Sequence, residues 1–131
     1  MNLPIDPHVL TWWSANSHGL GQHARDLISA PDNSIWVSVA SIWEISIKTS
    51  VGRLEISATP DGKISDDLER HGYRSLPVEV RHALAVRDLP LHHRDPFDRM
   101  LIAQARSEDL TLLTADPAIA AYDVRTIDAT R

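Results

Sequence analysis

The sequence contains no cysteine, which excludes both a disulfide framework and a thiolate metal site. This absence fits a reducing compartment, and we expect the protein to be cytoplasmic. No apolar run approaches the roughly 20 residues that a helix needs to span a membrane. The N-terminus also lacks a basic stretch followed by a long apolar run, which is the pattern of a signal peptide. We therefore expect no membrane partner.

Basic residues are few in this chain. It has 13 Lys and Arg residues against 18 Asp and Glu residues, for a formal net charge of −5. This balance argues against a general nucleic-acid binder, which presents a strongly basic surface. If four of the acids bind metal, however, they account for four of the five net negative charges. The remainder is then nearly neutral, and local basic residues can still contact phosphates.

The length and pattern of the chain predict one α/β domain. Its 131 residues suit a single domain, which we expect over residues 1–131. Short strand-like apolar runs alternate with helical segments, which predicts βαβ units and a mainly parallel sheet. Pro4 is awkward in the first strand, because proline removes a ladder hydrogen bond. The expected strands span residues 3–5, 35–37, 76–78, 110–113 and 124–127, and the expected helices span residues 8–13, 22–30, 41–51, 64–71, 79–87 and 97–108.

Four acidic residues, Asp6, Glu44, Asp98 and Asp116, are far apart in sequence but share a position in the pattern. Each follows a strand-like run or lies in the first turn of an expected helix. Strand ends and helix starts share one edge of a parallel sheet, and open α/β sheets bind ligands at that edge. Four carboxylates gathered there would repel one another unless a cation lay between them. Oxygen ligands suit hard divalent cations, so the pattern predicts a site for Mg²⁺ or Mn²⁺.

Ordinary helix starts are the competing explanation for these acids. Aspartate is a favoured N-cap and proline is favoured at the first helical position. Glu44 has two such explanations, a capping box with Ser41 and an ion pair with Lys48 one turn later. Three acids stand in Asp-Pro pairs, at residues 6–7, 95–96 and 116–117.

Asp98 is the hardest of the four acids to explain by capping. It lies four residues before Ile102 and seven before Ala105, so it continues the apolar stripe of its helix. An acid in that place faces the sheet edge and not the solvent. Asp95, three residues earlier, is the better candidate for a simple cap.

Four stretches of the sequence resemble signatures of PIN-domain ribonucleases, and most closely those of VapC-type toxins. The resemblance covers essentially the whole chain in the right order. It implies a three-layer α/β/α PIN-like domain with a mainly parallel central sheet, and metal-dependent cleavage of single-stranded or loop RNA. It also implies neutralisation by a cognate antitoxin and commonly a homodimer. The stretches are residues 5–13 (IDPHVLTWW), 37–45 (VSVASIWEI), 93–105 (HRDPFDRMLIAQA) and 112–116 (LLTAD).

The resemblance also assigns roles to residues by position. Asp6, Glu44, Asp98 and Asp116 match the acidic catalytic quartet of the family, and Thr114 matches a hydroxyl residue that often lines the site. The first block departs from the usual Asp-Thr-His, because Pro7 replaces the threonine. The threonine hydroxyl and one backbone N–H are therefore missing beside Asp6.

The chemistry of RNA hydrolysis suggests how these residues share the work. A bound cation lowers the pKa of water and neutralises phosphate charge. We expect Asp6 and Asp98 to bind metal directly, while Asp116 and Glu44 hold coordinated water or a second ion. Adjacent loop histidines, His92 and His93, are weak evidence for a metal site. Basic residues in or beside the signatures are candidates for RNA contact, namely Lys48, Arg53, Arg94 and Arg99.

The tryptophans point to a protein partner. Trp12 and Trp13 are adjacent on an expected helix and cannot share one face. We therefore expect one of them near the surface, in a groove for the antitoxin or for the dimer mate.

Three other functions remain open from the sequence. The first is a PIN-like binding module that is catalytically weakened, for which Pro7 is the main support. The second is a phosphoryl-transfer receiver or phosphatase on a similar sheet, but no lysine follows the strand at 110–113. The third is a nuclease directed at DNA, because an acidic site does not itself read a 2′-OH.

Overall fold

The structure, a computed structural model, describes residues 1–52 and 68–131. The expected helix at 64–71 lies partly outside the described residues, and residues 68–70 of it are helical. The elements are β1 (Asn2–Ile5), α1 (Pro7–Ala15), α2 (Gln22–Ser29), β2 (Ser34–Ser38), α3 (Val39–Ser50), β3 (Arg74–Leu76), α5 (Val80–Ala85), the 3₁₀ turn η2 (Val86–Asp88), α6 (Pro96–Ser107), β4 (Leu112–Thr114), the 3₁₀ turn η3 (Ile119–Ala121) and β5 (Thr126–Asp128).

The described strands form one parallel sheet in the order β3-β2-β1-β4-β5. β1 is central, and it pairs with β2 over its whole length and with β4 at Ile5 and Leu113. All carboxyl ends of the strands therefore lie at the same edge. The expectation of a mainly parallel sheet is confirmed.

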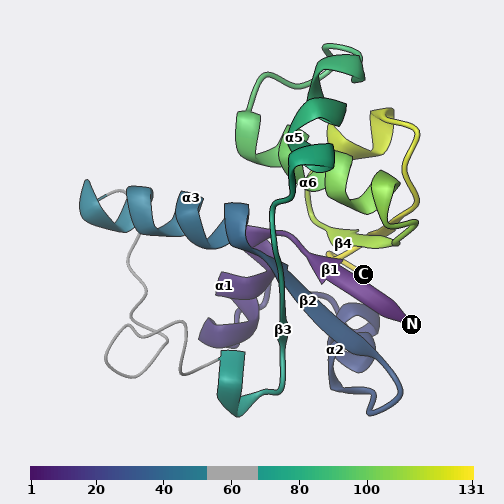
Figure 1. Ribbon diagram of the computed structural model, residues 1–131. Helices are drawn as coiled ribbons and strands as arrows, with labels where there is room; N and C mark the ends of the chain where they lie inside the picture. The colour runs from purple at the N-terminus through teal and green to yellow at the C-terminus, as the bar shows by residue number, and fades with distance from the viewer. Residues whose placement is uncertain (53–67) are drawn as a thin grey trace.

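Helices cover both faces of this sheet (Figure 1). One apolar core joins β1 and β2 to α1 and α2, with Leu3, Ile5, Val9 and Ile28 among its buried members. A second core packs α6 against Leu112 of β4. Leu112 and its neighbour Leu113 point to opposite faces, as consecutive strand residues do. The layers are therefore α/β/α, as the resemblance implies.

Pro4 fits the central strand because of where its nitrogen points. The N–H of Asp6 donates to the carbonyl of Leu113 on β4. Backbone directions alternate along a strand, so the nitrogen of Pro4 faces the same side, two residues earlier. β4 pairs with β1 only at Ile5. The missing donor of Pro4 thus costs the ladder no bond.

Two helix starts confirm the expected caps, and a third differs. Asp6 caps α1 by accepting the Val9 N–H at 2.9 Å. Asp95 caps α6 by accepting the N–H groups of Phe97 and Asp98. The Ser41 capping box with Glu44 is wrong, because the N-cap of α3 lies three residues earlier, at Ser38. Buried Ser38 ends β2 and caps α3 directly, by accepting the Ala40 N–H at 3.1 Å.

The last residues of the chain complete the start of α2. Its N-cap, Gly21, offers no side chain. Instead, the N–H groups of Gly21 and Ala24 donate to the carbonyls of Ala129 and Arg131, at 2.9 and 3.0 Å. A Cβ on Gly21 would lie 2.1 Å from the carbonyl carbon of Arg131. Glycine is therefore required by the close approach of the two segments.

None of the helices in the described part of the chain is both long and apolar enough to cross a bilayer.

Candidate functional site

Two acids meet at the carboxyl edge of the sheet, around one histidine. The Nε2 atom of His93 lies 2.9 Å from Oδ2 of Asp98 and 3.0 Å from Oδ2 of Asp116. One potential ligand atom from each of the three residues lies within 4.8 Å of those of the other two. Asp98 stands in the first turn of α6, and Asp116 follows β4 by two residues. The fold thus brings together two acids that are 18 residues apart in sequence.

Burial and the crowding of acids at the site raise the pKa of the Asp98 carboxyl group. Its pKa is raised from an ordinary 3.8 to about 7, first by burial and then by the negative charges of Asp95 and Glu44. Asp116 adds to the rise, and His93 opposes it. An unpaired carboxylate in such surroundings is costly, and a cation would relieve the cost. The oxygen donors and the excess negative charge fit a hard divalent cation.

Asp6 lies at the end of β1 and is only 2% exposed. Its Oδ1 accepts the Val9 N–H, and its Oδ2 accepts the hydroxyl of Thr114 and the N–H of Ala115. The hydrogen bonds that Pro7 cannot supply are thus replaced from α1 and the β4 end. A carboxylate has about four lone-pair sites, so roughly one remains for a metal.

Thr114 connects Asp6 to Asp116. Its hydroxyl donates to Asp6 and accepts the Asp116 N–H at 3.0 Å. The side chain is buried. Thr114 therefore fixes two members of the acidic quartet relative to each other, and Asp116 is fixed further by accepting the Ala118 N–H at 2.9 Å.

Glu44 faces inward from the second turn of α3 and is 4% exposed. It pairs with Lys48 at 2.8 Å, as the spacing predicts. This hydrogen bond is the main cause of a raised pKa at Lys48. Glu44, Lys48, Asp95 and Asp98 share a narrow cleft of about 90 Å³, which Pro7, His8, Thr11 and Ile45 also line.

Buried polar contacts set the distance between α3 and α6. The Ser38 hydroxyl donates to Oε1 of Gln104 at 2.6 Å, and Nε2 of Gln104 donates to the carbonyl of Pro77 at 3.1 Å. Ser38 and Gln104 are both fully buried. Because Ser38 starts the helix of Glu44 and Gln104 lies on the helix of Asp98, this contact aligns the two acids.

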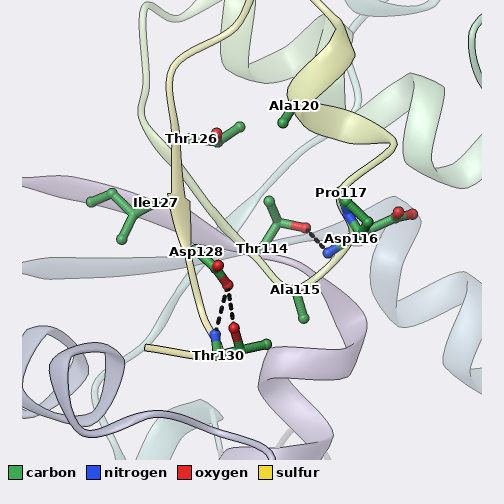
Figure 2. A pocket seen from close by; sticks show the side chains of 9 residues that line it. All are labelled: Thr114, Ala115, Asp116, Pro117, Ala120, Thr126, Ile127, Asp128 and Thr130. Carbon is green, nitrogen blue, oxygen red and sulfur yellow. Dashed lines mark hydrogen bonds between the residues drawn. The ribbon is translucent and has the colours of Figure 1, made fainter.

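A larger cavity lies on the other side of Asp116. It has a volume of about 330 Å³ and lies between the β4 end and β5. Figure 2 shows Asp128 and Thr130 joined by hydrogen bonds at its lower end, and the carboxylate of Asp116 turned away from Asp128. The narrow cleft thus reaches Asp98, and this larger cavity reaches Asp116. The lining residues are Thr114, Ala115, Asp116, Pro117, Ala120, Thr126, Ile127, Asp128 and Thr130.

Comparison with known families gives this geometry a context. The family model of the PIN domain matches residues 5–125. The chain belongs to the PIN-domain family. A comparison with curated protein sequences found no match.

Solved structures share the PIN fold over nearly the full length. VapBC2 from Rickettsia felis, bound to a DNA fragment from its promoter, matches with a TM-score of 0.74 and 13% identity, covering 98% of both chains. VapBC-1 from nontypeable Haemophilus influenzae matches with a TM-score of 0.66 and 15% identity, covering 100% of both chains. DNA-bound VapBC from Salmonella typhimurium matches with a TM-score of 0.66 and 13% identity, covering 98% of both. At these identities the likeness establishes the fold.

The basic residues expected to contact RNA have different surroundings in this PIN domain. Lys48 is partly exposed in the cleft beside Glu44 and Asp98, and Arg94 is exposed next to His93. Arg53 lies outside the described residues. Arg99 points inward, and its guanidinium donates to the carbonyls of residues 86, 89, 90 and 93 and to the hydroxyl of Tyr122. These bonds engage Arg99 with the loop before α6.

His93 is the site residue that sequence reasoning underrated. A histidine in a loop gives no periodic signal, and its neighbour His92 packs instead against the ring of Tyr122. The available clue was the position of His93 two residues before the N-cap of α6. A residue at that position lies beside the same sheet edge as Asp98.

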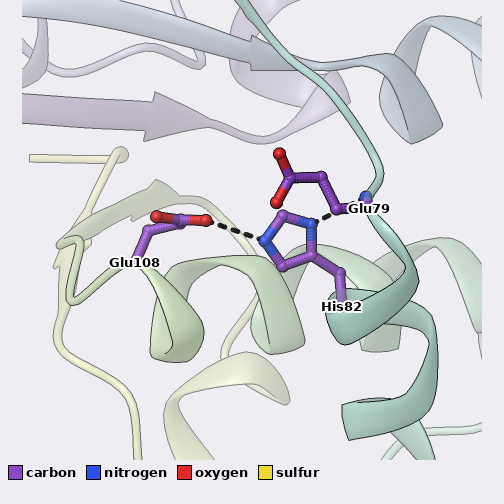
Figure 3. A group of neighbouring side chains, drawn as sticks. All are labelled: Glu79, His82 and Glu108. Carbon is purple, nitrogen blue, oxygen red and sulfur yellow. Dashed lines mark hydrogen bonds and ion pairs between the residues drawn. The ribbon is translucent and has the colours of Figure 1, made fainter.

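A second group of histidine and acids lies away from the site and is structural. Nδ1 of His82 accepts the Glu79 N–H at 3.0 Å, and its Nε2 lies 2.9 Å from Oε1 of Glu108 (Figure 3). A neutral ring that accepts at Nδ1 carries its proton on Nε2. His82 therefore donates to Glu108, and it has no free lone pair for a metal. The group fastens the start of α5 to the end of α6.

The tryptophans differ from the expectation in one respect. Trp12 and Trp13 are both partly buried and pack against the core of the α1 face. Trp43, on α3, is the exposed one, at 62%. It contacts Phe97 of α6 edge-on, with ring centroids 5.1 Å apart.

Proposed function

We propose that this PIN-domain protein is a metal-dependent endoribonuclease and acts as the VapC-type toxin of a toxin–antitoxin pair. The observation that carries the proposal is the convergence of Asp98 and Asp116 at the carboxyl edge of the sheet, where burial and neighbouring acids raise the pKa of Asp98 to about 7. Such perturbed groups in a cleft are typical of functional sites. The family resemblance supports the same assignment.

The acids would have different roles in binding the cation, because their surroundings differ. Asp98 and Asp116 would hold Mg²⁺ or Mn²⁺. Asp6, whose Oδ2 accepts the Thr114 hydroxyl, would offer its remaining lone pair. Glu44 adds negative charge from the cleft. When bound, the cation supplies Lewis acidity that activates water and offsets phosphate charge. Ser38, Gln104 and Thr114 would orient these acids through their buried hydrogen bonds.

RNA would approach along the two hollows beside the acids. Lys48, which lines the narrow cleft, and exposed Arg94 would contact phosphates, and the cavity between Asp116 and β5 would take a neighbouring nucleotide. The acids do not themselves distinguish ribose from deoxyribose. We propose RNA as the substrate because of the resemblance to VapC-type toxins.

A protein partner is supported by an exposed apolar stripe on α3, made of Val39, Trp43 and Ile47 at four-residue spacing. Exposed aromatic anchors are typical of protein interfaces. The similar VapBC structures favour a cognate antitoxin as partner, and a homodimer is a further use for such a surface.

The deciding experiment is cleavage of a panel of structured RNAs, with single-stranded DNA alongside, in Mg²⁺, Mn²⁺ and EDTA. We expect RNA cleavage that needs the metal and is lost in EDTA. A matched control is Asp109→Asn. The side chain of Asp109 is 91% exposed and pairs with Arg125, which is not one of the residues of the acidic site. Metal binding without cleavage of any RNA would favour the alternative of a weakened binding module, and cleavage of DNA alone would change the substrate class.

A further inference from the structure

Hydrogen bonds with Tyr122 and Arg99 hold the loop that carries His93. The His93 N–H donates to the hydroxyl of Tyr122 at 2.8 Å, and its carbonyl accepts from Arg99 at 3.4 Å. Arg99 also binds the carbonyls of Val86 and Pro90 at 3.0 Å each. Both backbone groups of His93 are therefore fixed, and the direction of its side chain is set by residues from α6 and from the segment after η3.

The ring of His93 has one tautomer that satisfies its contacts. The Asp95 N–H donates to Nδ1 at 3.2 Å, so Nδ1 uses its lone pair as an acceptor. In a neutral ring the proton is then on Nε2. That N–H donates to Oδ2 of Asp116 at 3.0 Å, and Oδ2 of Asp98 lies 2.9 Å from the same nitrogen. His93 therefore donates to Asp116, and the Asp98 carboxylate lies close to the same nitrogen.

We propose that His93 is a positioning residue of the site, whose Nε2–H holds the carboxylate of Asp116 beside that of Asp98. This inference rests on the proposed function. Asp116 gives His93 one of its lone-pair sites, and both carboxylates keep others for a cation. Donors behind metal-binding carboxylates fix their orientation and contribute to metal affinity.

The same contacts argue against His93 as a metal ligand. Binding through Nε2 would require the proton to move to Nδ1, where it would face the Asp95 N–H, donor against donor. His82 has the same arrangement, with a backbone N–H at Nδ1 and a carboxylate at Nε2. In both places the fold uses histidine to connect a backbone amide to an acid.

The test compares His93→Ala and His93→Gln in the full-length protein. Glutamine keeps an N–H donor at a similar reach and lacks a basic nitrogen. Mg²⁺ affinity, measured by titration calorimetry without RNA, should fall about 10- to 100-fold in His93→Ala, the usual range for loss of such a donor. It should recover for the most part in His93→Gln. The control is His92→Ala, which removes the neighbouring histidine and should leave the affinity unchanged.

A spectroscopic measurement reads the role directly. Long-range ¹H–¹⁵N NMR spectra of the wild-type protein should show the Nε2–H tautomer of His93 both before and after Mg²⁺ is added. Loss of the Nε2 proton on adding Mg²⁺ would make His93 a ligand and overturn the inference. Unchanged or tighter Mg²⁺ binding in a folded His93→Ala variant would overturn it as well. A wild-type protein that neither binds metal nor cleaves RNA would instead overturn the proposed function, so the two failures are distinguishable.

Discussion

Asp95 and Asp98 stand three residues apart at the same helix start, and their carboxylates have different surroundings. Asp95 accepts two backbone N–H groups of its own helix. Asp98 is largely buried, and its neighbours include Glu44, Asp95 and Asp116. Position in the first turn of a helix therefore does not determine function, and the direction of the side chain does.

The first prediction follows from that difference. Asp98→Asn should abolish RNA cleavage while the protein stays folded, because it removes a charge that the cation needs. Its melting temperature should stay equal or rise, since one of several like charges is gone. Cleavage assays and thermal unfolding measure the two effects, and wild-type rates from a folded variant would contradict the assignment.

Asp95→Asn is the matched control for that experiment. Asparagine caps a helix about as well as aspartate, so this variant should be much milder in both assays. Equal losses of activity in the two variants would make Asp95 a ligand.

The second prediction concerns pH. The pKa of Asp98 is raised in the folded protein from 3.8 to about 7, so the folded state binds more protons than the unfolded state between these values. The stability that this group contributes is complete below 3.8 and is lost as the pH rises through about 7. Thermal scans in EDTA should show this loss, and Asp98→Asn should flatten it.

The same proton competes with the cation. Metal affinity should therefore rise as the pH increases through about 7, with release of a proton on binding. Calorimetry in two buffers of different ionisation enthalpy counts the protons. An affinity that does not change between pH 6 and pH 8 would contradict the prediction.

At the residue scale, the sequence best predicted the features that depend on helical periodicity. The inward direction of Asp98 and the capping role of Asp95 both follow from helical spacing, and both are present in the structure. Arg99 and His93 were not predictable in this way. Their contacts are with backbone carbonyls and with Tyr122, whose position depends on the whole fold.

At the scale of elements, the order of strands and helices was predictable and their boundaries less so. β3 spans Arg74–Leu76 and not residues 76–78, because the pairing with Trp36 and Ser38 begins earlier and Pro77 has no N–H to extend it. Its first two residues are exposed at the edge of the sheet, so no apolar pattern indicated them. The start of α3 was missed because Ser38 serves both the strand and the helix.

The third prediction concerns the joint between α3 and α6, that is, the buried hydrogen bonds of Gln104 with Ser38 and Pro77. Gln104→Leu would leave the Ser38 hydroxyl and the Pro77 carbonyl without their partner inside the protein. Unsatisfied buried polar groups cost about 1–3 kcal/mol each, so the loss of both partners should lower the free energy of unfolding by roughly 2–6 kcal/mol. Denaturant unfolding measures it. Gln22→Leu, an exposed glutamine at the start of α2, is the control and should change stability little.

The rate of RNA cleavage by Gln104→Leu should fall by more than its loss of stability explains. The variant lacks the hydrogen bond to Ser38 that aligns the helices of Glu44 and Asp98. A variant that is destabilised but keeps full activity below its melting temperature would show that the joint does not align the acids.

At the scale of the whole molecule, the fourth prediction is that divalent cations stabilise the fold. The acids are gathered only in the native state, so a cation that binds there stabilises by mass action, roughly 2.7 kcal/mol at a hundredfold excess over Kd. Melting temperatures in Mg²⁺, Mn²⁺ and Ca²⁺ should exceed those in EDTA at the same ionic strength. Asp116→Asn should shrink the rise and Asp109→Asn should not.

Calcium separates binding from chemistry in this experiment. It accepts the same oxygen ligands in a looser geometry, so it should raise the melting temperature without supporting full cleavage. Equal melting temperatures in all four solutions, together with no cleavage, would remove the support for a metal site.

The hydrogen bond from Thr114 to Asp6 joins residues 108 positions apart, and this separation has a consequence for synthesis. The chain leaves the ribosome from its N-terminal side, and a domain generally folds as a unit. Asp6 emerges almost at once, but Asp98, Thr114 and Asp116 belong to the last third of the 131 residues. While those residues are still in the exit tunnel, the nascent chain has no assembled acidic site. A protein that cleaves RNA at this site would thus be harmless to the ribosome that makes it until residues 98–116 have left the tunnel.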